Sequence, residues 1–364
     1  MDEWTPVVVL PNLDMRGTIE CPYAALVPPT DRRVEKLRAD HPKLTTFLSK
    51  FSGQFGQQLW PSLLLLRTDA PKSYYTAESV TAFRDIISLS VVPYARALRL
   101  RFDRSRGLVF TTAFQFYPWM LDKRYEDVML TNPAQLHVHL LEPFNGQSFP
   151  EQSQATVMER DIDLPLAREL LNRWVVRFSE GAVEWKDKAL FRSLNMANEA
   201  GRIPALTAGT FYDVGRSLAL WVSAYEILAH PGGTGQSNLT TVTAMLESVK
   251  WCKAKLSAAT HTIPSKNQQK KQLATWICKK VYDLRNDFLH GNDVDAPGLS
   301  INGKVIIDFA ACLYRLTLTG FLDLHFDLPA PPREDAEAYG AFINKRLRFN
   351  KFQITYEDAL STAV

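Results

Sequence analysis

The sequence has few cysteines, and their spacing excludes a disulfide scaffold and a structural zinc site. Cys21, Cys252, Cys278 and Cys312 are scattered along the chain and form no CxxC pair. Disulfide scaffolds and structural zinc sites both need cysteines at short, regular spacings. Scattered, unpaired cysteines are typical of a reducing compartment, so we expect a cytoplasmic protein.

The sequence also lacks a secretory leader and a long apolar run free of charge. The first residues, MDEWTP, are acidic and carry no apolar leader core. The longest apolar stretch, residues 305–326, contains Asp308, Arg315 and Asp323. Each charge at a bilayer centre costs on the order of 2.5–3.5 kcal/mol on insertion scales. We therefore expect this stretch to form a buried or interface helix, and we expect no membrane partner.

Common cofactor and catalytic signatures are missing too. Residues 232–236, GGTGQ, lack the Lys and Ser/Thr of a phosphate-binding loop, and neither GxGxxG nor GxSxG occurs. His137 and His139 alternate as neighbours on one strand face would, but no third ligand stands at a suitable spacing. We expect neither a cofactor nor a metal site.

The chain is long enough for two domains, and its pattern changes near the middle. It has 364 residues, of which 46% are apolar, and a formal net charge of +3. Short runs rich in β-branched and aromatic residues predict strands in residues 1–150, and two stretches with helical periodicity lie between these strands. The predicted strands are VVVLP, GTIECPY, LWPSLLLLRT, LVFTTAFQFY and QLHVHLLEPF, and the helical stretches begin at DRRVEK and AESVTA.

Residues 145–154 are polar with Gly and Pro and predict a linker. Beyond it nearly every segment has helical periodicity, including residues 238–258, residues 265–291 and, more weakly, the last ~35 residues. The expected fold class is therefore α+β. A mixed α/β domain at 1–150, of unknown role, is followed by an all-α bundle at 156–364.

The stretch KKVYDLRNDFLHGND, residues 279–293, closes one of these helical segments. Arg285 is followed directly by Asn286, and His290 comes five positions after the arginine. Gly291 then predicts the end of the helix, because glycine adopts the left-handed conformation at little cost. Leu284 and its apolar neighbours predict that one side of this helix end is packed.

The phrase RN-x3-HG, preceded by Tyr282 and Leu284, resembles the signature of the HEPN superfamily of helical ribonucleases, in particular the ApeA-like branch found in bacterial defence proteins. The resemblance covers about residues 205–326. It implies metal-independent cleavage of RNA by a homodimer, with Arg285, Asn286 and His290 in the active site. Glu226 and Tyr282 would support the arginine. Such an effector would act in antiphage defence or as a toxin, restrained until the domain at 1–150 binds a trigger ligand or protein.

The residue types suit this chemistry. Cleavage by the 2′-hydroxyl of RNA needs one proton removed and one delivered, and histidine transfers protons near neutral pH. A guanidinium suits the charge that develops on phosphate, and Asn286 can orient His290. At ~100° per residue, Arg285 and His290 lie ~140° apart on a helix. A cleft lined by two copies could still use both, so we expect a two-fold symmetric dimer.

Basic and aromatic residues near the motif are candidates for binding RNA. Lysines contact phosphates without regard to sequence, and aromatic rings stack on unpaired bases. Asp287, Asp293 and Asp295 would oppose this unless they point away. The candidates are Lys270, Lys271, Lys279, Lys280 and Trp276.

Three alternatives stay open at this point. The motif can be an ordinary helix end, where cations are common. The helical domain can be a non-catalytic HEPN-fold module that binds RNA or a protein. A metal-dependent nuclease would instead use Asp161 and Asp163 with Glu184 and Lys186, but that site needs paired strands where the intervening sequence predicts a helix.

Overall fold

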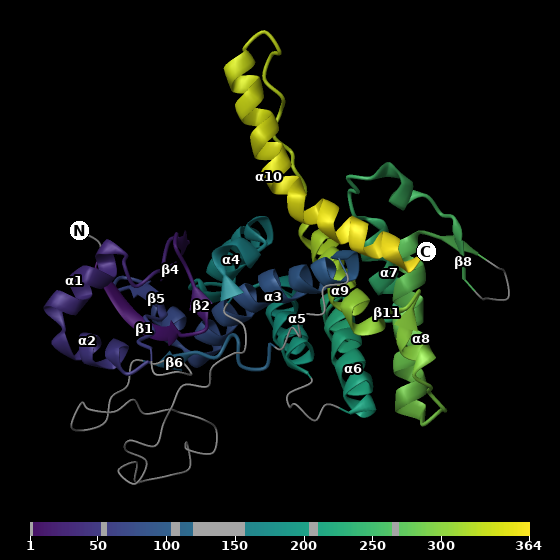
Figure 1. The fold of residues 1–364 in the computed structure, drawn as a ribbon, viewed down its shortest axis with the longest axis horizontal. Helices are drawn as coiled ribbons and strands as arrows, with labels where there is room; N and C mark the ends of the chain where they lie inside the picture. The colour runs from purple at the N-terminus through teal and green to yellow at the C-terminus, as the bar shows by residue number, and fades with distance from the viewer. Residues whose placement is uncertain (1–2, 52–56, 103–109, 119–156, 204–209, 264–268) are drawn as a thin grey trace. The chain divides into compact units, whose positions relative to one another are not determined.

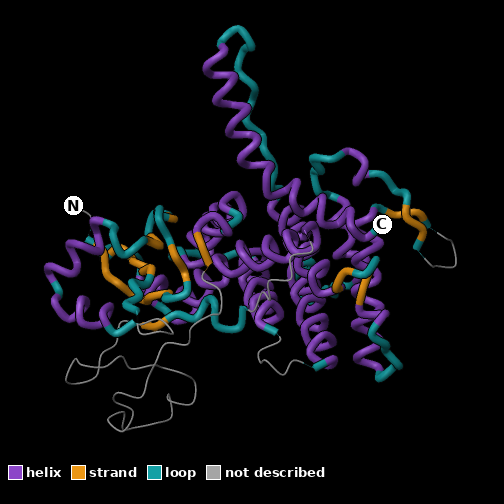
Figure 2. Tube along the Cα trace, in the orientation of Figure 1, coloured by secondary structure: helices purple, strands orange, loops and turns teal. Residues whose placement is uncertain are grey.

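The computed structural model describes residues 3–51, 57–102, 110–118, 157–203, 210–263 and 269–364. Helices and small sheets are both present, so the expected α+β class is confirmed (Figure 2). Two compact units are formed by 1–84, 109–162 and 171–182, and by 85–108, 163–170 and 183–364. We call them the mixed unit and the helical unit. Each unit combines stretches that are separated in the sequence. The expected domain boundary near residue 150 remains a prediction.

The mixed unit is built on a five-stranded antiparallel sheet (Figure 1). Its strands, in spatial order, are β3 (Ile19–Glu20), β4 (Ala24–Val27), β5 (Ser62–Arg67), β1 (Trp4–Leu10) and β6 (Tyr117–Pro118). Alternate residues of a strand point to opposite faces. Leu63 and Leu65 therefore meet the apolar stripes of two helices, α1 (Arg32–Asp40) and α2 (Pro42–Ser49), in one buried cluster.

The predicted helix beginning at DRRVEK is two helices. Asp31 caps the first by accepting a hydrogen bond from the N–H of Arg33 at 2.9 Å. Pro42 starts the second, where a residue without an N–H leaves no bond unmade. Of the run LVFTTAFQFY, the described residues 110–116 form a turn and irregular backbone, and among them and Tyr117 only Tyr117 joins a strand. The run QLHVHLLEPF, with His137 and His139, and the predicted linker lie outside the described residues.

Two long helices contribute residues to both units: α3 (Ala77–Phe102) and α4 (Leu164–Phe178). Within the mixed unit, the end of α4 packs aromatic rings against the residues before α3. The Tyr74 and Trp174 ring centroids lie 4.8 Å apart, and the Trp174 indole donates a hydrogen bond to the carbonyl of Ser79 at 3.0 Å. A short parallel pair, β2 (Leu13–Asp14) with β7 (Val157–Met158), joins distant parts of this unit.

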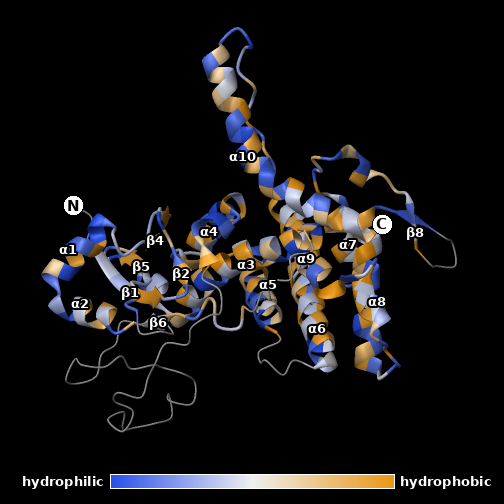
Figure 3. Cartoon of the chain, in the orientation of Figure 1, coloured by the Kyte–Doolittle hydropathy of each residue, from blue (hydrophilic) through white to orange (hydrophobic). Residues whose placement is uncertain are grey.

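The described part of the helical unit contains six further α-helices. They are α5 (Trp185–Arg202), α6 (Phe211–Leu228), α7 (Leu239–Glu247), α8 (Leu273–His290), α9 (Ile306–Leu322) and α10 (Ala336–Leu360). Residues 306–319 of α9 are all buried, and α6, α7, α8 and α10 each contact this helix. Figure 3 shows mixed polar and apolar residues along the part of α10 that projects from the other helices of the unit. The predicted buried helix at 305–326 is therefore confirmed as α9.

The charges inside α9 are neutralised by ion pairs. The Arg315 Nε donates to Asp163 Oδ2 at 2.9 Å, and Arg96 Nη1 donates to Asp308 Oδ1 at 3.1 Å. Burial raises the pKa of Asp308, although the Arg96 and Arg99 guanidiniums act to lower it. Among the described residues, no helix has the length and apolar character needed to cross a membrane.

The hairpin before α9 has a sequence that specifies its turn. Strands β10 (Ser300–Ile301) and β11 (Lys304–Val305) pair antiparallel around Asn302 and Gly303. Both residues have positive φ, at 49° and 72°, as a two-residue hairpin turn requires. The hairpin delivers the chain directly into α9.

Two predicted segments differ from the observed elements, and the weak helical pattern near the C-terminus is confirmed. Helix α7 ends at Glu247 rather than near residue 258, because the buried Glu357 carboxylate accepts the N–H groups of Cys252 and Lys253 at 2.7 and 2.8 Å. A short helix, η5 (Ala254–Ser257), follows. Lys270 and Lys271 form strand β9 (Lys270–Lys271) with β8 (His261–Thr262), not the first turn of α8. The weak pattern at the C-terminus is the 25-residue helix α10.

The structure does not provide the strands that the metal-nuclease alternative needs. Lys186 lies on α5, and α4 separates it from the two aspartates. The Asp163 carboxylate is bound by Arg315, and Asp161 accepts a hydrogen bond from the N–H of Met158 at 2.9 Å. That alternative is therefore wrong.

Candidate functional site

The motif RNDFLHG forms the last turn of α8 and its cap. Gly291 has φ 72° and ψ 22°, the left-handed conformation that ends a helix. The carbonyl of Asp287 accepts the N–H groups of Gly291 and, at 2.9 Å, of Asn292. The predicted helix stop at Gly291 is confirmed, and it leaves His290 as the last helical residue.

The end of α8 is fixed by close packing against the start of α6. Gly215 lies on α6 where a Cβ atom would come within 2.6 Å of the Phe288 ring and 3.1 Å of its Cβ. Any larger residue at 215 would require the Phe288 side chain or its helix to shift. The two helices run antiparallel, because the start of α6 meets the end of α8. This places Glu226, near the end of α6, beside the middle of α8.

Arg285 points from α8 toward α6. Its Nη2 lies 3.5 Å from the Glu226 carboxylate, and its Nη1 donates to Asn286 Oδ1 at 2.9 Å. Its Nε is buried and has no hydrogen-bond partner among the described residues. The side chain is 22% exposed, so the guanidinium is partly open to solvent and one of its donors is unused.

Glu226 and Tyr282 form the other side of this polar cluster. Burial raises the pKa of Glu226 above its usual value, although Arg285 and the Tyr282 hydroxyl both act to lower it. Burial also raises the pKa of Tyr282, so its hydroxyl stays protonated. That hydroxyl is buried and makes no hydrogen bond of ordinary geometry among the described residues. The structure thus brings together Arg285, Asn286, Glu226 and Tyr282.

His290 does not join this cluster within one chain. It is exposed, while Arg285 is partly buried against α6. Helical side chains lean toward the helix N-terminus, so Arg285 leans away from His290. At ~100° per residue, His290 lies ~140° from Arg285 but only ~40° from Trp276, which is fourteen positions earlier on the same helix. His290 therefore shares the exposed face of α8 with Trp276.

Two of the three aspartates near the motif are engaged locally. Asp287 Oδ1 accepts a hydrogen bond from Asn292 Nδ2, and Asp295 Oδ1 accepts one from the N–H of Gly298, each at 2.9 Å. Asp293 is exposed. These bonds tie the Asp287 carboxylate, on α8, and the Asp295 carboxylate to residues of the loop after the helix.

The candidate RNA-binding residues separate into paired and stacked side chains. Lys271 forms an ion pair with Glu247 at 3.1 Å, Lys279 forms one with Asp283, and Lys270 is exposed. Lys280 lies over the Trp276 ring, 4.6 Å from its centroid. Exposed ion pairs such as those of Lys271 and Lys279 contribute only ~0–1 kcal/mol to stability, so these lysines can leave their carboxylates for a phosphate.

Trp276 also contacts His261, with ring centroids 5.8 Å apart. We call His261, Trp276 and Lys280 the Trp276 patch. A cation over an aromatic ring beside a second ring is the composition of a surface that stacks on unpaired bases. The strand β8, which carries His261, was not predicted, because it pairs with residues of β9 that lie eight and ten positions later in the sequence.

The helical unit contains a second candidate that the sequence patterns did not indicate. A cavity of about 500 Å³ is lined by residues that follow α7, by residues that follow α9 and by the middle of α10. Lys250, Arg346 and Phe349 are among them. The only signal in the sequence was the mixture of basic and aromatic residues in KWCK, from 250, and NKRLRFNK, from 344.

Among the described residues, no three His, Cys, Asp or Glu side chains are grouped to hold a metal ion. Comparison of the chain with protein-family models, curated proteins and solved structures finds no match in any of the three.

Proposed function

We propose that this protein is a metal-independent endoribonuclease of the HEPN type that acts as a homodimer. The observation that carries the proposal is the state of Arg285 in the RNDFLHG motif. Its guanidinium is oriented by Glu226 and Asn286 and stays partly exposed, so donors remain for a ligand at its open side. An arginine held in position with spare donors suits an incoming phosphate.

The reaction needs only proton transfers and charge stabilisation. The 2′-oxygen of one nucleotide attacks the adjacent phosphorus, and the bond from phosphorus to the 5′-oxygen breaks. One proton leaves the 2′-hydroxyl and one is delivered to the 5′-oxygen, giving a 2′,3′-cyclic phosphate and a 5′-hydroxyl. His290 would transfer these protons, and Arg285 would stabilise the charge on the phosphate oxygens. No oxidant, reductant or metal enters the balance.

A dimer explains why the two residues diverge on one helix. Because Arg285 and His290 lie ~140° apart, one copy of α8 cannot present both to one phosphate from a single face. Two copies related by a two-fold axis would line one cleft with two arginines and two histidines. The Trp276 patch lies on the same face as His290 and would hold the RNA that leads into that cleft.

Such cleavage would harm the cell that makes the protein. We therefore infer a defence or toxin role in the cytoplasm, with activity restrained until a trigger acts. The mixed unit would bind that trigger, as a ligand or as a foreign protein. The resemblance of the RNDFLHG motif supports this part of the proposal.

The proposal is tested with the purified full chain and a labelled RNA on a denaturing gel in EDTA. Wild type, His290→Ala and a control, His41→Ala, are compared; His41 is an exposed histidine of the mixed unit. We expect His290→Ala to cut ~10²–10⁴-fold more slowly and the control to match wild type. New ends should accept a kinase label without phosphatase treatment, because they carry 5′-hydroxyls.

A matched substrate sharpens the result. RNA with a single 2′-deoxy nucleotide at the cleaved position should resist cutting there and nowhere else. Cleavage that persists in His290→Ala, or at the deoxy nucleotide, would contradict the proposal and return the motif to an ordinary helix end.

A second candidate is a non-catalytic module that binds RNA or a partner protein. The observation that favours it is the angular separation on α8. The Trp276 patch and His290 lie on one face of the helix, and Arg285 lies on another. In that case wild type cuts no RNA and its expression leaves host growth unchanged. A gel shift with single-stranded RNA would still weaken in Lys280→Ala.

A further inference from the structure

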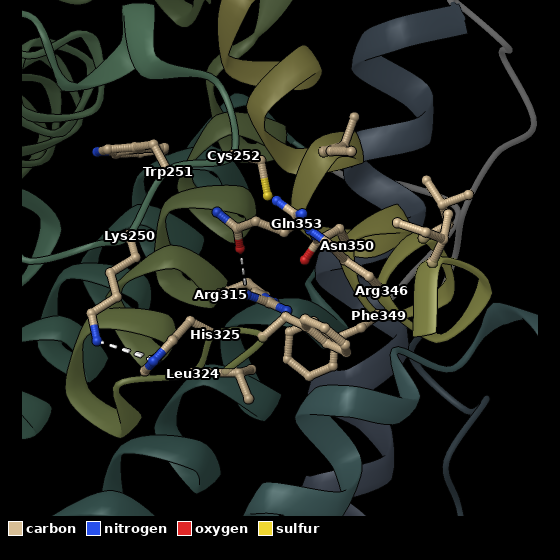
Figure 4. A pocket seen from close by; sticks show the side chains of 14 residues that line it. Lys250, Trp251, Cys252, Arg315, Leu324, His325, Arg346, Phe349, Asn350 and Gln353 are labelled. Atoms are coloured by element: carbon tan, nitrogen blue, oxygen red, sulfur yellow. Dashed lines mark hydrogen bonds between the residues drawn. The ribbon is translucent and has the colours of Figure 1, made fainter. Parts of the chain in front are cut away.

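The cavity beside α10 is cationic, and its lining contains no acidic side chain. Lys250, Arg315, His325 and Arg346 contribute to its walls, and none of the lining residues is Asp or Glu. Its volume of about 500 Å³ lies within the ~300–1,000 Å³ typical of sites for small ligands. Figure 4 shows Arg315, Arg346 and Asn350 around one space, with Lys250 and His325 along one side of it.

The four basic side chains differ in how far they are already neutralised. Arg315 is bound by Asp163 and Gln353, at 2.9 Å in each case, and forms a fixed base. Lys250 Nζ lies 2.9 Å from Asp323 Oδ1. Arg346 is exposed and makes no ion pair with any described residue. An anion entering the cavity would therefore meet Arg346 as its main uncompensated partner.

His325 offers a nitrogen toward the same side of the cavity. Its Nδ1 lies 2.6 Å from the carbonyl of Asp323. The Lys250 Nζ lies beside the ring, 3.3 Å from Nδ1 and 3.2 Å from Nε2. This arrangement holds Lys250 at the rim, where its charge adds to that of Arg346.

The remaining walls suit a planar heteroaromatic group. The Phe326 and Phe349 rings lie 5.6 Å apart, and both line the cavity. The Gln353 amide is used by Arg315 and by Glu357, to which its Nε2 donates at 3.1 Å. Asn350 is half-buried and lines the cavity with an amide that offers both a donor and acceptors. Rings for stacking, with one amide for edge recognition, are features of base recognition.

We propose that this cavity binds a nucleoside monophosphate, with the phosphate on Arg346 and Lys250 and the base between Phe349 and Asn350. The site is separate from the RNDFLHG motif and does not rest on ribonuclease activity. It uses the segment after α7 that Glu357 holds out of the helix, so the early end of α7 creates one of its walls.

The test is isothermal titration of the full chain with AMP. We expect one site per chain. Arg346→Gln should weaken binding by about tenfold or more, the loss expected of one charge-assisted hydrogen bond. The control is Arg348→Gln, two positions along on the same exposed stretch of α10 and not in the lining, which should bind as wild type does. Circular dichroism checks that each variant is folded.

Two further probes separate a nucleotide site from an anion site. Adenosine and inorganic phosphate should each bind at least about tenfold more weakly than AMP, because each lacks one half of the recognised group. Asn350→Ala should weaken AMP and leave phosphate unchanged. The proposal is overturned if AMP does not bind at millimolar concentration, or if Arg346→Gln and Arg348→Gln weaken AMP binding equally. It is also overturned if inorganic phosphate binds as tightly as AMP.

Discussion

Arg315 and Arg285 lie on neighbouring helices of the helical unit, and each has a carboxylate and a tyrosine beside it. Arg315 is 2% exposed and is bound by Asp163, Thr319 and Gln353, with its guanidinium 4.9 Å from the Tyr356 ring centroid. Its Nε and its Nη1 are both engaged by these groups. A buried guanidinium needs a counter-charge and hydrogen-bond acceptors, and the fold supplies both to Arg315.

Arg285 has the same kinds of neighbour but far weaker contacts. Its carboxylate partner, Glu226, lies at 3.5 Å rather than 2.9 Å and is itself 27% exposed, and its Nε is unpaired among the described residues. Under the proposed function, this contrast separates a structural arginine, which the fold saturates, from a functional one, which the fold orients and leaves with donors for a ligand.

The largest effect should come from breaking the saturated pair. Asp163→Ala leaves the buried Arg315 guanidinium without its counter-charge, which costs about 3–5 kcal/mol for pairs of this kind. Urea unfolding of wild type and variant measures the loss. The double variant Asp163→Ala with Arg315→Met should recover part of it, because no buried charge then remains. A loss below about 1 kcal/mol in the single variant would show that Arg315 is not a structural charge.

A smaller loss is expected where α6 and α8 touch. Gly215→Ala gains up to about 1 kcal/mol of helix propensity, but its Cβ would meet the Phe288 ring at 2.6 Å. Overpacking costs about 1–3 kcal/mol, so we expect a net destabilisation of about 1 kcal/mol. Thermal unfolding measures it. An equal or higher melting temperature would mean that Phe288 moves freely and that the end of α8 is not fixed by this contact.

The smallest effect concerns pH. The pKa of Glu226 is raised in the folded chain, so the folded state holds the proton more tightly than the unfolded state does. Stability should therefore fall as pH rises from the ordinary glutamate value of 4.5 through the raised value, and then stay level. Glu226→Gln should lack this fall. Unfolding free energies across that window test the sign, and a rise for wild type relative to the variant would contradict it.

The end of α8 could be predicted from the sequence because its cause is local. Gly291 ends the helix by its own conformational freedom, so the stop needs no distant partner, whereas the contact of Phe288 with Gly215 was not visible in the sequence. The turn at Asn302 and Gly303 is local in the same way. For such elements, a few consecutive residues carry all the information.

The features that could not be predicted depend on distant residues. Helix α7 ends early because the Glu357 carboxylate accepts the backbone N–H of Lys253, a residue 104 positions earlier in the sequence. The partner of Arg315 lies 152 positions away in the sequence. Charge and periodicity identify each residue as polar or apolar, but they do not say which carboxylate meets which arginine. The cationic cavity beside α10 was missed for the same reason.

The most direct test of the contrast between the two arginines is a paired measurement on Arg285→Ala. We predict that its unfolding free energy stays within about 1 kcal/mol of wild type, as for a partly exposed ion pair. We predict that its rate of RNA cleavage in EDTA falls by about 10²-fold or more, as when a group that stabilises transition-state charge is removed. A stability loss as large as that of Asp163→Ala, with cleavage by the folded fraction unchanged, would show that Arg285 is a second structural arginine.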